Sequence, residues 1–356
     1  MSVPTTMRAA RLHAPATADR PADLRIDDDV PVPTPGPDQV LVRIAACGVC
    51  ASDLHVVDGI TPHGPGLPLT LGHEPAGTIV ATGDLVTDWR PGDRVAFAAG
   101  RPCRRCEYCL AGRDNICANL AVLGVDVDGA QAEYAVAPTD VLVPLPAEVA
   151  FEQAAIVVDA VATPYHALKR GGVGEGVTVA VVGLGGLGMH AVQLAKLAGC
   201  DVVGVDIDAV NLERALDWGA DEVVDASDGQ AARAVRRLTG GGVDRAFEFV
   251  GVADTVDQAV KSCKPGGRAV VVGLSPQTLS TVPIARFVSQ ETELVGSFGA
   301  TTQDVGELYD LLAEGRLDLS RSVTHRTDLD GLPDALDQLR TREGHPIRTV
   351  VTYPTD

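Results

Sequence analysis

The stretch VTVAVVGLGGLGMHAVQLAKLAGCDVVGVD, residues Val177–Asp206, decides the fold of the chain around it. It opens with an apolar, β-branched run of strand length, Val177–Val182, and a glycine-rich turn follows directly. The segment from Met189 to Ala198 carries alanine and leucine at helical spacing, and Val202–Val205 form a second apolar run. The stretch therefore predicts a strand, a tight turn, a helix and a second strand in succession.

The glycines of the turn fit the pattern G-x-G-x-x-G, which binds the pyrophosphate of a dinucleotide. Gly183 permits the tight turn, Gly185 lets the phosphates approach the backbone, and Gly188 lets helix and strand pack closely. The turn continues through Gly186 and Leu187 into the helix, whose start offers free N–H groups and the positive end of the helix dipole. A dinucleotide site is therefore predicted here.

Asp206 ends the second apolar run, close to the spacing of about 20 residues at which an acid binds the ribose of a dinucleotide. Its carboxylate is placed to accept hydrogen bonds from both ribose hydroxyls and to repel the 2′-phosphate of NADP. The residues that follow, 207–211, contain no cation and add a second acid, Asp208. The predicted cofactor is therefore NAD.

Two other interpretations of this stretch are weaker. Glycines also serve simply as loop residues, but the flanking strand, helix and acid argue against that use here. The run Val177–Ala195 has no charged residue and is long enough to span a membrane, yet a glycine turn, His190 and Gln193 interrupt it. The dinucleotide site remains the better prediction.

The whole chain has 356 residues, which is too long for one ordinary core and suits two domains. Its net charge of −19 argues against nucleic acid or an anionic membrane as a partner, because both require clustered cations. The N-terminal residues lack the apolar core of a signal peptide, which predicts a cytoplasmic protein. In that compartment the eight cysteines are not expected to form disulfides.

Four of the cysteines lie close together, as Cys103-x-x-Cys106-x-x-Cys109 and, after a short gap, Cys117. Four thiolates at this spacing can close a tetrahedron around Zn²⁺, and a closed site of this kind is structural. The alternative is a cluster of unrelated buried thiols, but a four-cysteine pattern is a strong metal signal. We therefore predict a structural zinc lobe at about residues 100–118.

Two styles of sequence divide the chain. Residues 7–46 read as short strands broken by proline and glycine, which is typical of antiparallel β structure. From Phe151 onward, apolar runs alternate with helical segments, which predicts an α/β fold with a doubly wound parallel sheet. The runs are Val177–Val182, Val202–Val205, Glu222–Val224, Arg245–Val250, Ala269–Val272 and Leu294–Ser297.

After about Gly299 the chain is expected to return to its first domain. Helices are predicted near Asp304–Ala313 and Leu332–Leu339, and a last strand near Arg348–Thr352. The predicted domains are residues 1–158 with 300–356, and residues 159–299 for the dinucleotide-binding domain.

Further motifs match a known family over essentially the whole chain. They are GVCASDLH at Gly48–His55, GHE at 72–74, GDRV at 92–95 and VVDAVATPYHAL at 157–168, together with the cysteine lobe and the glycine pattern. In this combination the sequence resembles the zinc-containing medium-chain alcohol dehydrogenases. The resemblance implies a Rossmann cofactor domain and a GroES-like catalytic domain that is irregular and mostly antiparallel β. It also implies two zinc ions per chain, and hydride exchange between NAD(P) and an alcohol bound at the catalytic zinc.

The resemblance assigns the first two ligands of the catalytic zinc to Cys50 and His73. Many relatives have a cysteine as third ligand, whereas the matching place here holds Asp159, as in some bacterial relatives. Because a carboxylate is a harder ligand than a thiolate, zinc affinity and Lewis acidity are expected to differ. The alternative for Asp159 is a helix N-cap or a surface acid, but its apolar neighbours make an unpaired carboxylate expensive. The fourth position stays open for water or substrate.

Other polar residues take roles by the same resemblance. Ser52 and His55 match a hydroxyl and an imidazole that relay the proton of the alcohol to solvent; the alternative for His55 is an ordinary surface histidine. Asp53 resembles the acid that orients the histidine ligand, and Glu74 an acid beside the zinc that can exchange as a ligand. Arg348 stands where relatives place an arginine near that acid and the cofactor phosphates.

One feature of the substrate follows from a departure from the family pattern. Many relatives carry an aromatic residue that faces the substrate four positions before the first structural cysteine, where this sequence has Ala99. The missing ring predicts room for a secondary or bulky alcohol, with Leu123 among the residues that line the rest of the pocket.

We therefore expect a zinc-dependent oxidoreductase that transfers a hydride between an alcohol and NAD and yields an aldehyde or ketone. The alternative enzymes are related polyol, aldehyde or hydroxyacyl dehydrogenases with the same chemistry. A non-catalytic cofactor-binding protein is disfavoured, because such a protein has no need of a proton relay. The expected partner is a small alcohol or carbonyl compound, and the resemblance favours a homo-oligomer, a tetramer over a dimer.

Overall fold

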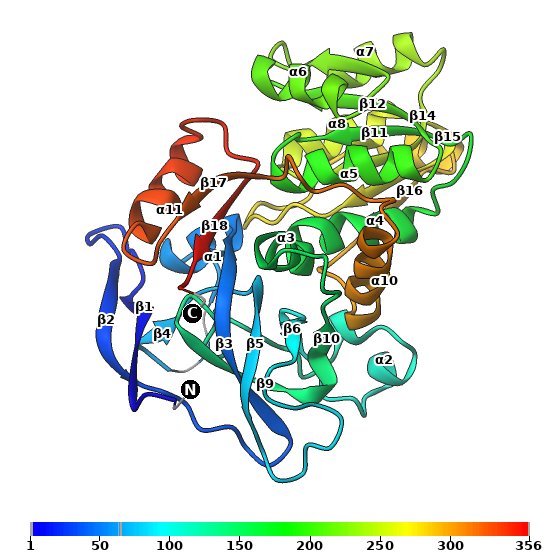
Figure 1. Cartoon of the computed structure of the whole chain (residues 1–356). Coiled ribbons are helices and arrows are strands. Elements are labelled where there is room, and N and C mark those ends of the chain that lie inside the picture. Colours follow the sequence, from blue (N-terminus) through cyan, green and yellow to red (C-terminus); the bar gives the residue numbers. More distant parts are fainter. Residues whose placement is uncertain (1–2, 63, 65, 355–356) are drawn as a thin grey trace. The chain divides into compact units, whose positions relative to one another are not determined.

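A computed structural model describes residues 3–62, 64 and 66–354, and Figure 1 shows their helices and strands. The chain forms two compact units. The first unit consists of Met1–Ala162 and Ala300–Asp356, and the second is Thr163–Gly299. The first boundary follows residue 162 rather than the expected 158, so Asp159 belongs to the first unit.

The second unit is built on a parallel sheet of six strands in the order β13-β12-β11-β14-β15-β16. The strands are β11 (Thr178–Val182), β12 (Asp201–Asp206), β13 (Glu222–Asp225), β14 (Val243–Glu248), β15 (Cys263–Val271) and β16 (Glu293–Gly296). The helices are α4 (Ala162–Gly171), α5 (Gly186–Leu197), α6 (Ala209–Asp217), α7 (Ala231–Leu238), α8 (Ala253–Ser262) and α9 (Ile284–Ser289). The strand order reverses between β11 and β14, which is the doubly wound topology that the sequence predicts.

The glycine turn joins β11 to α5 at this reversal. Val182 pairs with Val205 in the register of β11 and β12, so the turn and Asp206 meet at one edge of the sheet. Helix α5 begins at Gly186 rather than at the predicted Met189, because the glycine turn itself winds into the first helical turn. The uncharged run Val177–Ala195 is thus divided between a strand, a turn and a helix.

Close packing at the turn depends on glycine at two positions. Gly183 has a φ of +89°, a backbone conformation that favours glycine. A Cβ on Gly188 would stand 1.8 Å from the carbonyl oxygen of Gly183. Helix α5 can therefore approach the turn this closely only while residue 188 has no side chain.

The first unit is mostly antiparallel β structure, as expected. Its largest sheet has the order β10-β6-β5-β3-β18-β17, with β9 also paired to β3, and smaller sheets are β2-β1-β4 and β7-β8. The strands are β1 (Thr6–Ala14), β2 (Asp23–Pro31), β3 (Gln39–Val49), β4 (Leu69–Thr70), β5 (Pro75–Thr82), β6 (Arg94–Phe97), β7 (Gly100–Arg101), β8 (Ala121–Val122), β9 (Tyr134–Pro138), β10 (Leu142–Pro144), β17 (Val323–Thr327) and β18 (Arg348–Thr352).

Short helical segments connect these strands. They are α1 (Ala51–Val57), α2 (Glu107–Leu110), η1 (Asp114–Ile116), η2 (Thr139–Val141), α3 (Phe151–Ile156), η3 (Val157–Val161), α10 (Thr302–Ala313) and α11 (Leu332–Thr341). No helix in the part of the chain that the structure describes is long and apolar enough to cross a membrane.

Strand β3 lies at the centre of the large sheet and is buried along most of its length, since nearly all its side chains are small or apolar. The last strand, β18, pairs with it in antiparallel register, with Thr349 opposite Val49. Figure 1 shows this pairing as the red end of the chain lying beside the blue β3. The pairing places Arg348 next to Cys50, the residue that follows β3.

Candidate active site

Strand β3 and helix α1 position Cys50, which is the N-cap residue of α1. The backbone N–H of Cys50 donates to Asp53 Oδ2 at 3.0 Å, which ties the first turn of the helix to the end of the strand. The other oxygen of the buried Asp53 carboxylate lies 3.5 Å from Nδ1 of His73. One acid thus orients both the cysteine backbone and the histidine ring, as a second group behind a metal ligand commonly does.

Asp159 reaches the same place from a distant part of the chain. It lies in η3, a turn of π-helix between α3 and α4 that holds one more residue than an α-helical turn. Its Oδ2 is 3.3 Å from Cys50 Sγ and 3.7 Å from His73 Nε2. Turns of this kind occur often at functional sites, because they change the direction in which a helical side chain points.

The side chains of Cys50, His73, Glu74 and Asp159 each offer a ligand atom, and these atoms lie within 4.8 Å of one another. Thiolate, imidazole and carboxylate are the ligands that zinc prefers. Glu74 Oε2 is fully buried and has no hydrogen-bond partner among the described residues. The donor set and this unsatisfied buried oxygen both fit a Zn²⁺ ion held by Cys50, His73 and Asp159, with Glu74 beside it.

Arg348 supplies the nearest positive charge. Its guanidinium is buried, and Nη2 lies 3.3 Å from Glu74 Oε1, 3.7 Å from Asp159 Oδ2 and 3.9 Å from Cys50 Sγ. One guanidinium therefore faces three groups that become negative on losing a proton. A second positive charge is needed before all three can ionise at low cost.

The pKa shifts in this cluster also show that the buried acidic groups cannot all ionise easily. Burial and the neighbouring Asp159 raise the pKa of the Cys50 thiol, and burial raises the pKa of Glu74 to about 7. Burial alone lowers the pKa of His73, but the Asp53 and Asp159 carboxylates raise it well above its usual value. A divalent cation among these groups would favour the thiolate, the carboxylates and the neutral imidazole.

Ser52 and His55 lie on α1, three residues apart and so on one side of the helix. Ser52 is partly exposed, and its Oγ lies 3.8 Å from Cys50 Sγ. His55 is partly exposed in the last turn of the helix. The two side chains thus lead from the cluster toward the surface of this unit.

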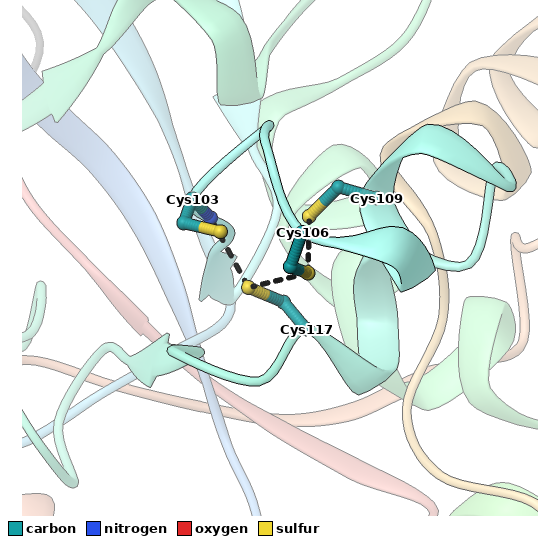
Figure 2. A group of neighbouring side chains, drawn as sticks. All are labelled: Cys103, Cys106, Cys109 and Cys117. Carbon is teal, nitrogen blue, oxygen red and sulfur yellow. Dashed lines mark hydrogen bonds between the residues drawn. The ribbon is translucent and has the colours of Figure 1, made fainter.

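Figure 2 shows the second cluster, in which the sulfur atoms of Cys103, Cys106, Cys109 and Cys117 face one another. All four lie within 4.8 Å of one another, and Cys106 Sγ is 3.5 Å from Cys109 Sγ and 3.8 Å from Cys117 Sγ. Zinc–sulfur bonds of about 2.3 Å give a tetrahedron with edges of about 3.8 Å, so the spacing fits a closed zinc site. All eight cysteines of the chain are free of disulfides.

The lobe that carries these cysteines favours thiolates by its backbone. The N–H of Arg105 and other donors lower the pKa of Cys103 to about 6, and N–H groups of Cys109 and Ala118 lower that of Cys106. Burial raises the pKa of Cys109 to about 12. A bound cation would hold all four sulfurs as thiolates, which is the state that ligates zinc.

The second unit carries the predicted dinucleotide site. A Cβ on Gly185 would meet no atom within 4 Å, so the space above this residue is open to a ligand. Asp206 is held beside the turn because its carboxylate accepts from the N–H of Leu184 at 2.6 Å, Ile207 at 2.8 Å and Asp208 at 2.9 Å. The first turn of α5 has no side-chain cap, which leaves N–H groups available to a phosphate.

The structure differs from the sequence analysis at Leu123. This side chain was expected to line the substrate pocket, but it is fully buried in the apolar core of the first unit. Its neighbour in the expected pocket, Ala99, is partly exposed, and its carbonyl accepts from the N–H of Leu123 at 2.9 Å. A long aliphatic side chain next to a strand is preferentially packed inward, and the sequence pattern does not separate core from pocket.

Comparison with known proteins finds two family models that match the chain. Residues 36–147 match a family model described as the alcohol dehydrogenase GroES-like domain, and residues 186–314 match one described as a zinc-binding dehydrogenase.

Similar proteins extend the match to nearly the whole chain. An alcohol dehydrogenase of Geobacillus stearothermophilus is 38% identical over 85% of this chain and 88% of its own length. A sorbitol dehydrogenase of Bacillus subtilis is 32% identical over 99% of both chains. The solved structure of acetophenone reductase from Geotrichum candidum in complex with NAD superimposes with a TM-score of 0.86, at 31% identity over 99% of both chains.

Replacing Cys106 by serine should remove the zinc of the cysteine lobe and leave the other metal site filled. We expect zinc content to fall by about one ion per chain and the melting temperature to fall by roughly 5–10 °C, because a structural zinc stabilises only the folded state. Metal analysis and calorimetry measure both. Cys200→Ser, a buried cysteine outside the lobe, is the control and should keep its zinc. Unchanged zinc in Cys106→Ser would contradict the assignment.

Replacing Asp159 by alanine should remove the catalytic zinc and abolish turnover while the fold survives. Asp159→Cys, which restores a ligand common in relatives, should keep the metal. Glu152→Ala is a matched control on the same helical segment, because Glu152 pairs with Arg326 at the surface. Zinc per chain and alcohol oxidation should be measured together. Full activity in Asp159→Ala would show that another residue is the third ligand.

Proposed function

Because the chain belongs to the zinc-containing medium-chain alcohol dehydrogenase family, we propose that it is an NAD-dependent dehydrogenase of secondary or bulky alcohols. The observation that carries this proposal is the convergence of Cys50, His73 and Asp159 on one buried point. A thiolate, an imidazole and a carboxylate at that distance are the three protein ligands of a catalytic zinc that keeps one position for substrate.

The residues of the first unit prepare this point for the alcohol oxygen. When bound, zinc polarises the alcohol oxygen and NAD accepts the hydride. Asp53 fixes the ring of His73, and Arg348 offsets the charge of Glu74 and Cys50. Glu74 is near enough to exchange as a ligand, which supports the alternate role expected for it. A contact between Arg348 and the cofactor phosphates is part of the same proposal.

The proton of the alcohol is proposed to leave through Ser52 and then His55. The Ser52 hydroxyl is close to the ligand Cys50, and His55 lies one helical turn further on the same side of α1. A hydroxyl can accept one proton while it donates another, and an imidazole can release it at neutral pH. The order of the two groups therefore suits a path from the buried cluster to water.

The size of the substrate is proposed from Ala99, where many relatives have an aromatic ring. Acetophenone, the ketone in the name of the Geotrichum relative, is the product of a bulky secondary alcohol. Polyol oxidation is the second candidate, because the Bacillus sorbitol dehydrogenase matches this chain along its full length. Both candidates use the same metal and hydride chemistry.

We also propose that the chain forms a homo-oligomer, a tetramer rather than a dimer. Apolar side chains on α9 are exposed, among them Ile284 at 82% and Val288 at 66%. Strand β16 ends the sheet of the same unit and has an unpaired edge among the described strands. Exposed apolar groups beside a sheet edge are typical of an association surface. Light scattering on the purified chain measures the state, and a monomer would contradict the proposal.

The function is tested by incubating the zinc-loaded protein with NAD and a panel that contains ethanol, 1-phenylethanol and sorbitol. NADH absorbance should rise fastest with 1-phenylethanol. Ala99→Trp should raise the kcat/KM for ethanol relative to that for 1-phenylethanol by about tenfold or more, because the ring fills space beside the substrate. Ethanol as the best wild-type substrate would overturn the size argument, and sorbitol as the best would establish the second candidate.

The relay predicts different effects for its two members. Ser52→Ala should lower kcat by about 100-fold, because the hydroxyl is the first group to receive the proton. His55→Ala should be slow mainly at low pH and should recover in imidazole buffer, since a diffusing base can replace an exposed one. A pH–rate profile identical to that of the wild type would remove His55 from the mechanism.

The cofactor should be NAD rather than NADP. Asp206 lies buried beside the glycine turn, and repulsion of a 2′-phosphate there should cost a few kcal/mol, or on the order of 100-fold in affinity. Asp206→Ala should lose most of the preference for NAD over NADP, as measured by kcat/KM with each cofactor. A wild type that used both equally well would show that Asp206 does not face the ribose.

A further inference from the structure

Glu248 is a fully buried acid at the end of β14. Its Oε1 accepts from the backbone N–H of Val250 at 2.8 Å, from that of Gly251 at 2.8 Å and from the hydroxyl of Thr255 at 2.7 Å. These donors lie in the turn after the strand and in the first turn of α8. A single oxygen therefore fixes the connection between strand and helix.

Helix α8 begins directly after this connection. Its N-cap residue, Val252, makes no side-chain hydrogen bond, whereas helices usually begin with a polar side chain that accepts from the first N–H groups. The N–H of Ala253, the first residue of the helix, donates to Gln277 Oε1 at 2.9 Å, whereas Glu248 accepts from the side chain of Thr255 and places a negative charge near the positive end of the helix dipole. Its other oxygen, Oε2, is buried without a hydrogen-bond partner among the described residues. Burial raises the pKa of this acid, so the position is expensive for a carboxylate.

The turn that Glu248 holds packs directly against the glycine turn. Val250 Cγ2 is 2.6 Å from the place that a Cβ on Gly183 would occupy. On its other side, Gly251 N is 2.1 Å from the corresponding place on Gly273, which follows β15. Val250 is 38% exposed, so part of its side chain faces outward beside Gly183. These contacts lie where the strand order reverses, which is where ligands of such sheets bind.

We propose that Glu248 is a positioning residue for the dinucleotide. It acts through Val250, which it holds against Gly183 as a side wall of the glycine turn. The proposal rests on NAD binding at this turn, as in the function proposed above. It goes further because it assigns a role in cofactor affinity to Glu248. This acid contacts the backbone of the turn after β14 and does not contact the reacting atoms.

If Glu248 only stabilised the unit, removing its carboxylate would lower the melting temperature without changing how the folded protein binds NADH. A positioning residue changes the dissociation constant for NADH and the KM for NAD, and leaves kcat and the KM for the alcohol nearly unchanged. The zinc-loaded full-length protein should therefore be titrated with NADH and assayed with alcohol in four forms: wild type, Glu248→Ala, Glu248→Gln and Asp244→Ala.

Glu248→Ala should raise the dissociation constant for NADH by about tenfold or more, with kcat within about twofold of the wild type. Glu248→Gln should stay close to the wild type, because its amide oxygen can accept from the same donors. Asp244 is the matched control, since it lies at the other end of β14, accepts from the N–H of Thr178 at 3.1 Å and is paired with Lys264. Asp244→Ala should lower stability and leave NADH affinity unchanged.

An unchanged NADH affinity in folded Glu248→Ala, with only a lower melting temperature, would overturn the proposal. If that variant does not fold, Thr255→Val removes one donor to the same oxygen and should raise the dissociation constant by about threefold. Equal affinity of Thr255→Val and the wild type would then overturn it. Failure of the wild type to bind NADH would instead overturn the proposed function, and the role of Glu248 with it.

Discussion

The crowding of acidic groups around one buried point constrains the first unit more than any other interaction. Cys50, Glu74 and Asp159 share one guanidinium, that of Arg348, and none of them is well exposed to water. Without further positive charge, each can ionise only at the expense of the others. The strand pairing that brings Arg348 to Cys50 and the turn that brings Asp159 there therefore assemble a site whose charge balance is completed by a cation.

In the second unit, the main constraint is the close approach of backbone segments at the glycine turn. Gly188 leaves no room for a side chain where α5 meets the turn, and Gly183 leaves none where Val250 packs against it, whereas the space above Gly185 is open. The same absence of a side chain therefore serves tight packing at two positions and access for a ligand at the third. Asp206 binds the turn from the neighbouring strand through the backbone N–H of Leu184 and is itself held by the N–H groups of Ile207 and Asp208.

The local sequence pattern predicts some features of the structure and fails to predict others. The cysteine lobe, the glycine turn and the alternation of strands and helices in the second unit could be predicted, because each depends on residues close together in sequence. The π-turn at Asp159 could not, since nothing in its apolar neighbours distinguishes it from an ordinary helix. Nor could the contact of Val250 with the glycine turn at Gly183 or the burial of Leu123, because both depend on what packs there from distant segments.

The discontinuous first unit has a consequence for the order of events during synthesis. The segment Ala300–Asp356 leaves the ribosome after all of Thr163–Gly299, so the second unit can fold while the first still lacks β17 and β18. Until then β3 has an open edge, and Cys50 and Asp159 have no guanidinium beside them. The cysteine lobe, in contrast, has all four of its ligands within one short segment that is made before the second unit begins.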